Sequence, residues 1–402
     1  MNRIIKQVNF YMAEKKMSGF RARLDYLLKH NYAFNRTFNF SMNVFLRVWG
    51  WFVPIDEKLI VFSAHTRKYN DSPRAIYEFM IAHDEYKGYK YIWALEDPDN
   101  VEVPGPAMKV KSDTKDYFKV TLKAKYWITC VNIERGLHYK KKKCIYLNTW
   151  HATPVKTMGN SAAGRKDYDF AHVDYFCIAG EYEKEIYKKD LCIREESVIR
   201  TGLPRNDELY HFTKEETDAI KNRLSIPLDK KVILYAPTWR DSKDGGKTYA
   251  MKPPIDVKYW EEQLSDEYVL LFRTHQYTNT VLGVQFNDFC RDFCSYPVVN
   301  DLIKIADIMI SDYSAIIFDY CITERPLLCF GYDYDEFAKD RGFYVNIEDV
   351  LPMGVQRTQE ELIQLIKTMD YKDASQKTKE FKNRYMQYGG HATETCVKTV
   401  FG

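Results

Sequence analysis

Short apolar runs alternate with longer amphipathic stretches from residue 58 onward. The runs have the length of buried strands, and the stretches between them are long enough for helices. In the first half, strands are predicted at 58–63, 89–95, 125–130, 143–148 and 175–179, and a helix at 181–189. Strands that alternate with helices in this way predict a parallel, doubly wound α/β sheet.

The same alternation restarts after residue 205. Strands are predicted at 231–236, 268–273, 308–311 and 326–330, and helices at 214–224, 358–369 and about 374–401. Two successive Rossmann-like halves predict a GT-B-like fold, in which two domains face a cleft and ligands bind at the carboxyl ends of the strands. We expect these domains at 56–210 and 211–402, with the last helix crossing back to the first domain.

Residues 1–55 form a basic leader that is rich in aromatic side chains. Before residue 50 it has nine basic and two acidic residues, a charge of nine minus two or +7, whereas the whole chain carries only +3. Such a segment suits the interface of an anionic membrane. The alternative is a helical pair packed on the first domain, and the two roles are compatible. We expect a peripheral protein, because the chain shows neither a signal peptide nor the roughly 20 apolar residues needed to span a bilayer.

Composition limits the chemistry further. The small net charge of +3 argues against nucleic-acid binding. The nine cysteines show no CxxC pair and no zinc spacing, which is typical of reduced core residues in the cytoplasm. No Walker loop, GxGxxG, nucleophile elbow or HExxH motif occurs. We therefore expect no bound metal and no other cofactor, although dependence on a divalent metal stays open.

The first candidate catalytic residue is His151, in the segment NTWHATPVKTMG directly after a predicted strand. Loops at strand ends carry function because the strands hold them in place. A histidine there can take a proton from an attacking hydroxyl, since the pKa of an imidazole lies close to working pH. The alternative is a structural histidine that is bonded to nearby backbone.

A second histidine, His275, lies just past a predicted strand of the second half, with Arg273 two residues before it. Residues two apart in an extended segment share a face, so we expect both side chains to face a phosphate. The alternative is that Arg273 pairs with a surface carboxylate and His275 caps the strand. A histidine at the equivalent strand end of each half favours the functional role.

The segment IMISDYSAIIFD combines a strand, a polar turn and an apolar helix. Ser314 is predicted to cap that helix, whose free N–H groups and positive end suit a phosphate. Asp312 at the turn suits ribose hydroxyls, a metal or a partner histidine. Asp319, about two helical turns further on, is expected on the same side of the helix. Plain capping by Asp312 or Ser314 is the alternative, and it does not exclude phosphate binding.

Two further polar segments offer phosphate ligands. The segment YAPTWR contributes Thr238 and Arg240, and the segment RTGLPRND at the expected domain boundary contributes Arg205 and Asn206. Arginine geometry suits bidentate contact with phosphate. A single arginine of this kind more often forms a surface or structural ion pair.

Six segments together resemble the CDP-glycerol glycerophosphotransferase family, the teichoic acid primases and polymerases. They are WHATPVK at 150–156, GLPRND at 202–207, YAPTWR at 235–240, RTH at 273–275, SDYS at 311–314 and RGFY at 341–344. The resemblance covers roughly residues 58–370, and six motifs in order are far more specific than any one of them. Two departures are Ala152, where the family usually has glycine, and LPMG at 351–354 in place of a proline-glycine-proline segment. A glycine-to-alanine change would shift the His151 loop if that position required positive φ.

The resemblance implies transfer of glycerol phosphate from CDP-glycerol to a hydroxyl of a membrane-linked teichoic-acid-type acceptor, with release of CMP. It makes the first domain the acceptor domain and the second the CDP-donor domain. It also implies His151 as the base, and His275, Asp312 and Ser314 as residues that serve the donor phosphates. The implied partners are CDP-glycerol, a lipid-linked saccharide or polyol-phosphate acceptor, and the anionic cytoplasmic face of the cell membrane.

Other functions remain open from the sequence. A CDP-ribitol ribitolphosphotransferase, or a GT-B glycosyltransferase that uses a nucleotide sugar, would share the fold. A catalytically inactive membrane scaffold is a third alternative, although the presence of both His151 and His275 argues against it. The short length of the chain favours a primase over a polymerase. The sequence is also compatible with a homo-oligomer.

Overall fold

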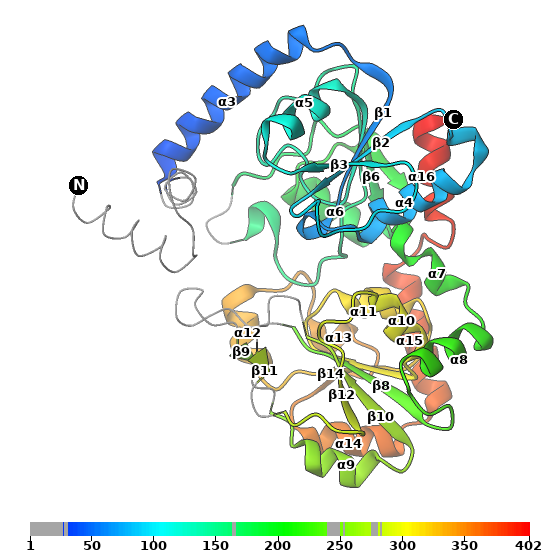
Figure 1. Ribbon diagram of the computed structural model, residues 1–402. Helices are drawn as coiled ribbons and strands as arrows, with labels where there is room; N and C mark the ends of the chain where they lie inside the picture. Colours follow the sequence, from blue (N-terminus) through cyan, green and yellow to red (C-terminus); the bar gives the residue numbers. More distant parts are fainter. Residues whose placement is uncertain are drawn as a thin grey trace. The chain divides into compact units, whose positions relative to one another are not determined.

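The computed structural model describes residues 27, 31–162, 166–238, 250–251, 254–274, 280–281 and 284–402 (Figure 1). The chain divides into two compact units. The first unit comprises the described residues up to 68 together with 88–128 and 132–146. The second comprises 69–87, 129–131 and 147–402. The candidate site described below lies within the second unit.

The first sheet has seven strands in the order β3-β2-β1-β4-β5-β6-β7. The pairs β1–β2, β2–β3, β5–β6 and β6–β7 are parallel. The strand order reverses between β1 and β4, as in a doubly wound sheet. The strands are β1 (Asp56–Ser63), β2 (Lys90–Leu95), β3 (Met108–Lys111), β4 (Ala124–Thr129), β5 (Ile145–Asn148), β6 (Tyr175–Ile178) and β7 (Val198–Arg200).

The second sheet has six strands in the order β12-β10-β8-β13-β14-β15, and every pair in it is parallel. Its order reverses between β8 and β13. The strands are β8 (Lys231–Ala236), β10 (Tyr268–Phe272), β12 (Cys290–Asp292), β13 (Ile308–Ser311), β14 (Leu327–Phe330) and β15 (Val355–Gln356). A separate parallel pair joins β9 (Ala250–Met251) to β11 (Thr280–Val281). The predicted α/β fold with two parallel, GT-B-like sheets is confirmed.

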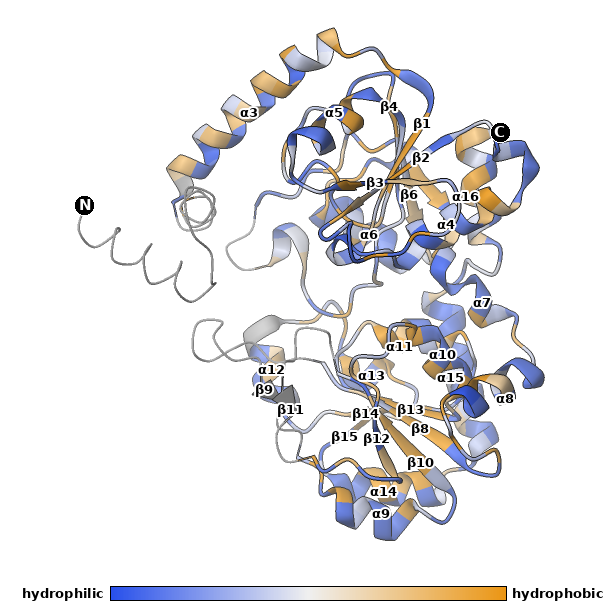
Figure 2. Cartoon of the chain, viewed as in Figure 1, coloured by the Kyte–Doolittle hydropathy of each residue, from blue (hydrophilic) through white to orange (hydrophobic). Residues whose placement is uncertain are grey.

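Both faces of the second sheet are covered by helices, which explains its continuous apolar strands (Figure 2). Successive residues of a strand point to opposite faces. Accordingly, Val232 and Leu234 of β8 belong to a buried cluster with α10, α11 and α15. Ile233 and Tyr235 belong to a second cluster with α9 and α14.

The helices alternate with the strands as predicted. They are α3 (Tyr32–Phe52), α4 (Asp71–Ala82), α5 (Lys115–Lys123), α6 (Glu181–Asp190), α7 (Asp207–Tyr210), α8 (Lys214–Arg223), α9 (Val257–Leu264), α10 (Val299–Ile305), α11 (Ile316–Cys321), α12 (Tyr334–Arg341), α13 (Ile347–Val350), α14 (Gln359–Thr368), α15 (Tyr371–Tyr385) and α16 (Ala392–Phe401). The predicted helices α6, α8 and α14 are confirmed. Helices α8 and α14 each begin with a capping box, which Thr213 and Glu216 form in α8 and Thr358 and Glu361 form in α14.

The C-terminal stretch, predicted as one helix, is two helices, α15 and α16. The break lies at Gly389 and Gly390, whose φ angles of +155° and +87° disfavour residues with a side chain. A Cβ at Gly389 would also lie 2.2 Å from the Tyr210 hydroxyl oxygen. After the break, α16 packs on α4, and the Cys396 sulfur lies 3.4 Å from that of Cys177 in β6.

In the described part of the leader, α3 is a single helix of 21 residues. Its N-cap is Asn31, whose side chain accepts a hydrogen bond from a backbone N–H of the first turn. Four apolar residues at helical spacing, Phe40, Val44, Val48 and Trp51, are exposed to solvent. Among the residues that the structure describes, no helix is long and apolar enough to cross a membrane.

Candidate active site

The donor-side candidates Thr238 and Asp312 meet where the second sheet reverses its strand order. Thr238 follows β8, Asp312 follows β13, and both side chains are buried. Asp312 Oδ1 accepts hydrogen bonds from the backbone N–H of Thr238 at 2.8 Å and of Tyr313 at 2.6 Å. Ligands of doubly wound sheets bind at the carboxyl ends of the strands beside this reversal. The structure therefore brings two predicted site residues together at the place where a ligand is expected.

Ser314 follows the same turn, but it does not cap the next helix. The N-cap position of α11 is Ala315, which has no side-chain acceptor. The backbone carbonyl of Ser314 accepts from the Ile317 N–H at 3.3 Å, so backbone atoms close this turn. The predicted capping by Ser314 is therefore wrong, whereas its contact with a donor phosphate stays a prediction.

Arg273 directly follows β10 and is bonded to backbone carbonyl groups. Its Nη1 donates to the carbonyl oxygens of Phe293 at 3.0 Å and Tyr296 at 2.5 Å. Burial lowers the pKa of Arg273, although a guanidinium remains charged at any physiological pH. Within the described residues, Arg273 is thus held by backbone carbonyl groups and not by the surface carboxylate of the predicted alternative. A guanidinium at this position suits an anionic ligand.

The predicted residues His275 and Arg240 lie outside the described residues. Their roles in phosphate binding, and the catalytic role of His275, stay predictions.

His151 lies in the loop after β5, and its imidazole is held in one tautomer. Nδ1 is 2.8 Å from the carbonyl oxygen of Cys130, which follows β4. A carbonyl oxygen can only accept, so Nδ1 carries the proton and Nε2 carries the basic lone pair. The half-buried imidazole ring also lies 4.5 Å from the indole ring of Trp150, measured between ring centres. The backbone bond expected of a structural histidine is thus present, it also fixes the orientation of the ring, and the catalytic role of His151 stays a prediction.

The turn before His151 is unusual in its backbone. Trp150 has a φ of +51°, a conformation that a bulky side chain rarely adopts. Two side chains hold it there: Asn148 Oδ1 accepts from the Trp150 N–H at 2.9 Å, and the Thr149 hydroxyl donates to the Trp150 carbonyl at 3.0 Å. Ala152 is not one of the positive-φ residues of the described chain, so an alanine fits where the family usually has glycine.

Helix α6 binds the residues that follow His151. Three of its side chains contact three successive loop residues: Tyr187 donates to the Ala152 carbonyl at 2.8 Å, Glu183 Oε2 accepts from the Thr153 hydroxyl at 2.7 Å, and Tyr182 donates to the Pro154 carbonyl at 2.9 Å. Sequence reasoning predicted the helix but missed this role, because Tyr and Glu at helical spacing are also typical of an ordinary amphipathic helix.

Arg205 binds the His151 loop from another side through a buried ion network. Its Nη1 donates to Asp71 Oδ2 at 3.0 Å and to the carbonyl oxygen of His151 at 2.6 Å, and its Nη2 donates to Asp319 Oδ2 at 3.0 Å. Asn206 Nδ2 donates to Asp319 Oδ1 at 2.6 Å. Burial alone would lower the pKa of Arg205, but the carboxylates of Asp319 and Asp71 more than compensate and raise it. The network favours a role in fixing the loop, and the predicted phosphate-binding roles of Arg205, Asn206 and Asp319 stay predictions.

Asp71 is a member of this network that sequence reasoning missed. It opens α4 with a φ of +60° and lies 134 positions from Arg205 in the chain. Its side chain is only 11% exposed and that of Arg205 only 15%. An aspartate near a helix start is read as a capping residue, so no local signal marks it as the partner of a distant arginine.

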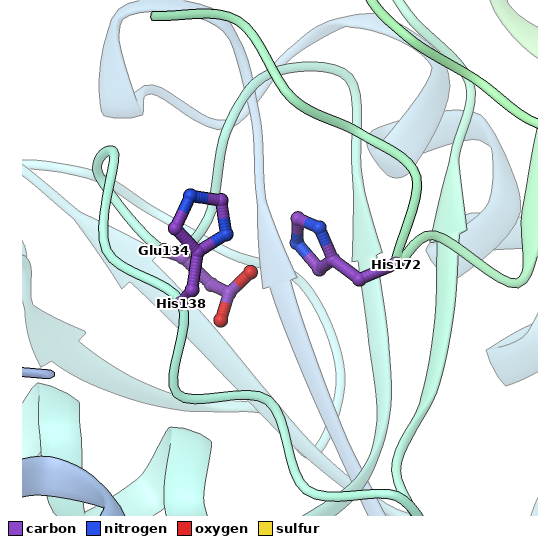
Figure 3. Close-up of side chains that lie close together, drawn as sticks. All are labelled: Glu134, His138 and His172. Atoms are coloured by element: carbon purple, nitrogen blue, oxygen red, sulfur yellow. The ribbon is translucent and has the colours of Figure 1, made fainter. Parts of the chain in front are cut away.

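A separate group consists of Glu134, His138 and His172, which the sequence analysis did not single out (Figure 3). Glu134 Oε1 accepts from the backbone N–H groups of Tyr139 and Lys140. Glu134 and His138 belong to the first unit and His172 to the second, and none of them belongs to the candidate active site.

Comparison with known proteins identifies the family of the chain. The sequence model of the family described as CDP-Glycerol:Poly(glycerophosphate) glycerophosphotransferase matches residues 45–402. A teichoic acid poly(glycerol phosphate) polymerase of Staphylococcus epidermidis is 34% identical over 79% of this chain, and the chain spans about half of that relative, 46%. A teichoic acid glycerol-phosphate transferase of Staphylococcus aureus is 32% identical over 78% of this chain and 85% of its own length.

A solved structure also supports the fold. The wall teichoic acid polymerase TagF, in a variant form, superimposes with a TM-score of 0.79 at 30% identity, covering 91% of this chain and 97% of that chain. The chain therefore belongs to the CDP-glycerol:poly(glycerophosphate) glycerophosphotransferase family.

Proposed function

We propose that the protein transfers glycerol phosphate from CDP-glycerol to a hydroxyl of a lipid-linked, teichoic-acid-type acceptor and releases CMP. The observation that carries this proposal is the fixed tautomer of His151. With its Nδ1 proton bound to a backbone carbonyl, His151 is oriented to use Nε2 as the base for an acceptor hydroxyl.

The proposed step is a single displacement at phosphorus. The acceptor hydroxyl loses its proton to His151 Nε2, and its oxygen attacks the phosphorus that bears glycerol. A new O–P bond forms, the bond from that phosphorus to the bridging oxygen breaks, and CMP leaves with the bonding electrons. Charge that develops on the phosphoryl oxygens needs positive groups nearby, and we assign this role to Arg273, with His275 and Arg240 as expected contributors.

The donor nucleotide is assigned to the second sheet. Thr238 and Asp312 lie at the carboxyl ends of the two strands beside the reversal of strand order, and Arg273 follows the next strand. A buried aspartate beside backbone N–H groups suits the hydroxyls of a ribose, and a guanidinium suits the pyrophosphate. Ser314, in the same turn as Asp312, is assigned to a phosphate oxygen.

A parallel donor assay tests the reaction. The purified chain is given a lipid-linked acceptor with CDP-glycerol, CDP-ribitol or a UDP-sugar, and nucleotide release is measured for each. We expect CMP release with CDP-glycerol to exceed release from the other two donors. Faster release from CDP-ribitol would instead assign the chain as a ribitolphosphotransferase, and release only from the UDP-sugar would assign it as a glycosyltransferase.

We further propose that the protein acts at the cytoplasmic face of the cell membrane, held there by α3. Phe40, Val44, Val48 and Trp51 form an exposed apolar stripe, and the described helix has no acidic residue. Beside the stripe, an apolar cavity of about 560 Å³ lies between α3 and α5, with Lys115 at its lining. An amphipathic helix with aromatic residues and flanking basic groups suits an anionic bilayer surface.

The replacement Trp51→Glu should weaken binding to vesicles that contain anionic lipid by roughly tenfold or more, because a large apolar side chain that leaves the bilayer loses its burial energy. Trp51 is 80% exposed, so the fold should tolerate the change. Vesicle flotation measures the bound fraction. Leu228→Glu, at an exposed apolar residue outside α3, is the matched control and should leave binding unchanged. Equal binding by both variants and the wild type would contradict the role of α3.

A further inference from the structure

Glu183 is a fully buried carboxylic acid in direct contact with the His151 loop. Its Oε1 accepts from the backbone N–H of Ala179, and its Oε2 lies 2.7 Å from the Thr153 hydroxyl and 3.2 Å from the Tyr187 hydroxyl. The proposed reaction gives Glu183 no chemical role. Its contacts therefore need a separate explanation.

The number of available protons indicates which form of Glu183 suits these contacts. Tyr187 has one hydroxyl proton but two acceptors within reach, the Ala152 carbonyl at 2.8 Å and Glu183 Oε2 at 3.2 Å. When Glu183 is protonated on Oε2, it donates to the Tyr187 oxygen, and Tyr187 is free to donate to Ala152. When Glu183 is ionised, it competes with Ala152 for the single Tyr187 proton. The neutral acid therefore satisfies the contacts of Tyr187 with both Ala152 and Glu183 at once.

Burial brings the ionisation of Glu183 into the physiological pH range. Burial raises the pKa of Glu183 to about 7, although bonds from Ala179, Thr153 and Tyr187 and the charge of Arg205 act in the opposite direction. Tyr182 and Tyr187 of the same helix also face the loop, and burial raises the pKa of both, so they stay neutral. Among these three residues of α6, Glu183 is therefore the one that changes charge near pH 7.

We propose that Glu183 is a positioning residue that holds the His151 loop in its reactive shape only while it is protonated. The loop carbonyl of Ala152 keeps its bond from Tyr187 in the neutral state and loses it to the carboxylate in the ionised state. Because Ala152 is the neighbour of His151, loss of that bond moves the base relative to the acceptor hydroxyl. This inference rests on the proposed role of His151 in the transfer reaction.

The direction of the pH effect follows from the ionisation. Below about pH 7 the acid is neutral and the loop is held, and as pH rises through about 7 the loop is released. We expect kcat for CMP release to fall across this interval by roughly two- to tenfold, the effect of about one hydrogen bond. The KM for CDP-glycerol should change little, because the donor is assigned to the other sheet.

The test compares pH profiles of the wild type and Glu183→Gln. The introduced amide is never charged and can donate to the Tyr187 oxygen at every pH, so the fall of kcat near pH 7 should disappear from the profile. Glu185→Gln is the matched control, because Glu185 lies on the same helix and is exposed, and it should keep the wild-type profile. Tyr187→Phe is a second variant: it removes the shared proton, so its kcat should be lower and should also lack the transition near pH 7.

The outcomes separate this inference from the proposed function. CMP release with identical kcat profiles for the wild type and Glu183→Gln would overturn the positioning role alone. No CMP release by the wild type at any pH would overturn both the proposed function and the inference that rests on it. Thermal unfolding of each variant, followed by circular dichroism, confirms that the profiles compare folded proteins.

Discussion

Replacing His151 with alanine should lower kcat for CMP release from CDP-glycerol by roughly 10²- to 10⁴-fold, the usual contribution of a general base. The structure gives the physical reason. The Nδ1 proton is bound to the Cys130 carbonyl at 2.8 Å, so the lone pair that can accept a proton is on Nε2. The KM for CDP-glycerol should stay close to that of the wild type, because the donor contacts are assigned to other residues. Steady-state kinetics with a saturating acceptor measures both constants.

A matched control is His83→Ala. His83 is exposed, and its Nδ1 is likewise 2.7 Å from a backbone carbonyl, that of Phe79, so the two histidines share the same local bond. The control should keep the kcat of the wild type. Near-normal turnover of His151→Ala on a defined acceptor would remove His151 from the chemistry, and an equal loss in both variants would point to a general effect on the fold.

Replacing Arg205 with methionine should destabilise the protein by about 3–5 kcal/mol, the usual cost of removing one partner of a buried ion pair. Methionine keeps the apolar stem but leaves the carboxylates of Asp71 and Asp319, which are 11% and 13% exposed, without their cation. The carbonyl of His151 also loses its bond from Arg205. Urea unfolding at constant pH measures the free energy of unfolding.

The control for Arg205 is Arg200→Met. Arg200 pairs with Glu181 at the surface, where both side chains are about 40% exposed, and surface pairs add little to stability. This variant should unfold at nearly the same urea concentration as the wild type.

A double variant tests the network further. Asp319→Asn combined with Arg205→Met should recover part of the unfolding free energy that Arg205→Met loses, because one uncompensated charge is removed. If Arg205→Met is as stable as its control, the network does not hold this part of the fold.

Much of the fold could be predicted from the sequence because the central strands are buried on both faces. Such strands form continuous apolar runs, and those predicted at 58–63, 231–236 and 308–311 are strands of the structure. The strands that were missed are short edge strands such as β3, β7, β12 and β15. β3, at Met108–Lys111, has the sequence MKVK and no buried residue, so it lacks the apolar run that marks a strand.

The site could be predicted only in part, because motifs mark residues and do not mark their partners. The sequence placed His151 after a strand and Asp312 in a turn, and the structure agrees. It could not show that Asp71 and Arg205 meet, since they are 134 positions apart. The role of Glu183 was also missed, because burial and a shared tyrosine proton are properties of packing that spacing along the chain does not reveal.

Mass spectrometry of the acceptor tests the central claim most directly. The purified chain is incubated with a defined lipid-linked acceptor and CDP-glycerol, and the mass of the acceptor is measured before and after. We predict that the acceptor gains one or more whole glycerol-phosphate units, in step with the CMP released. An acceptor whose mass is unchanged with CDP-glycerol, but which gains a sugar from a nucleotide sugar, would contradict the account.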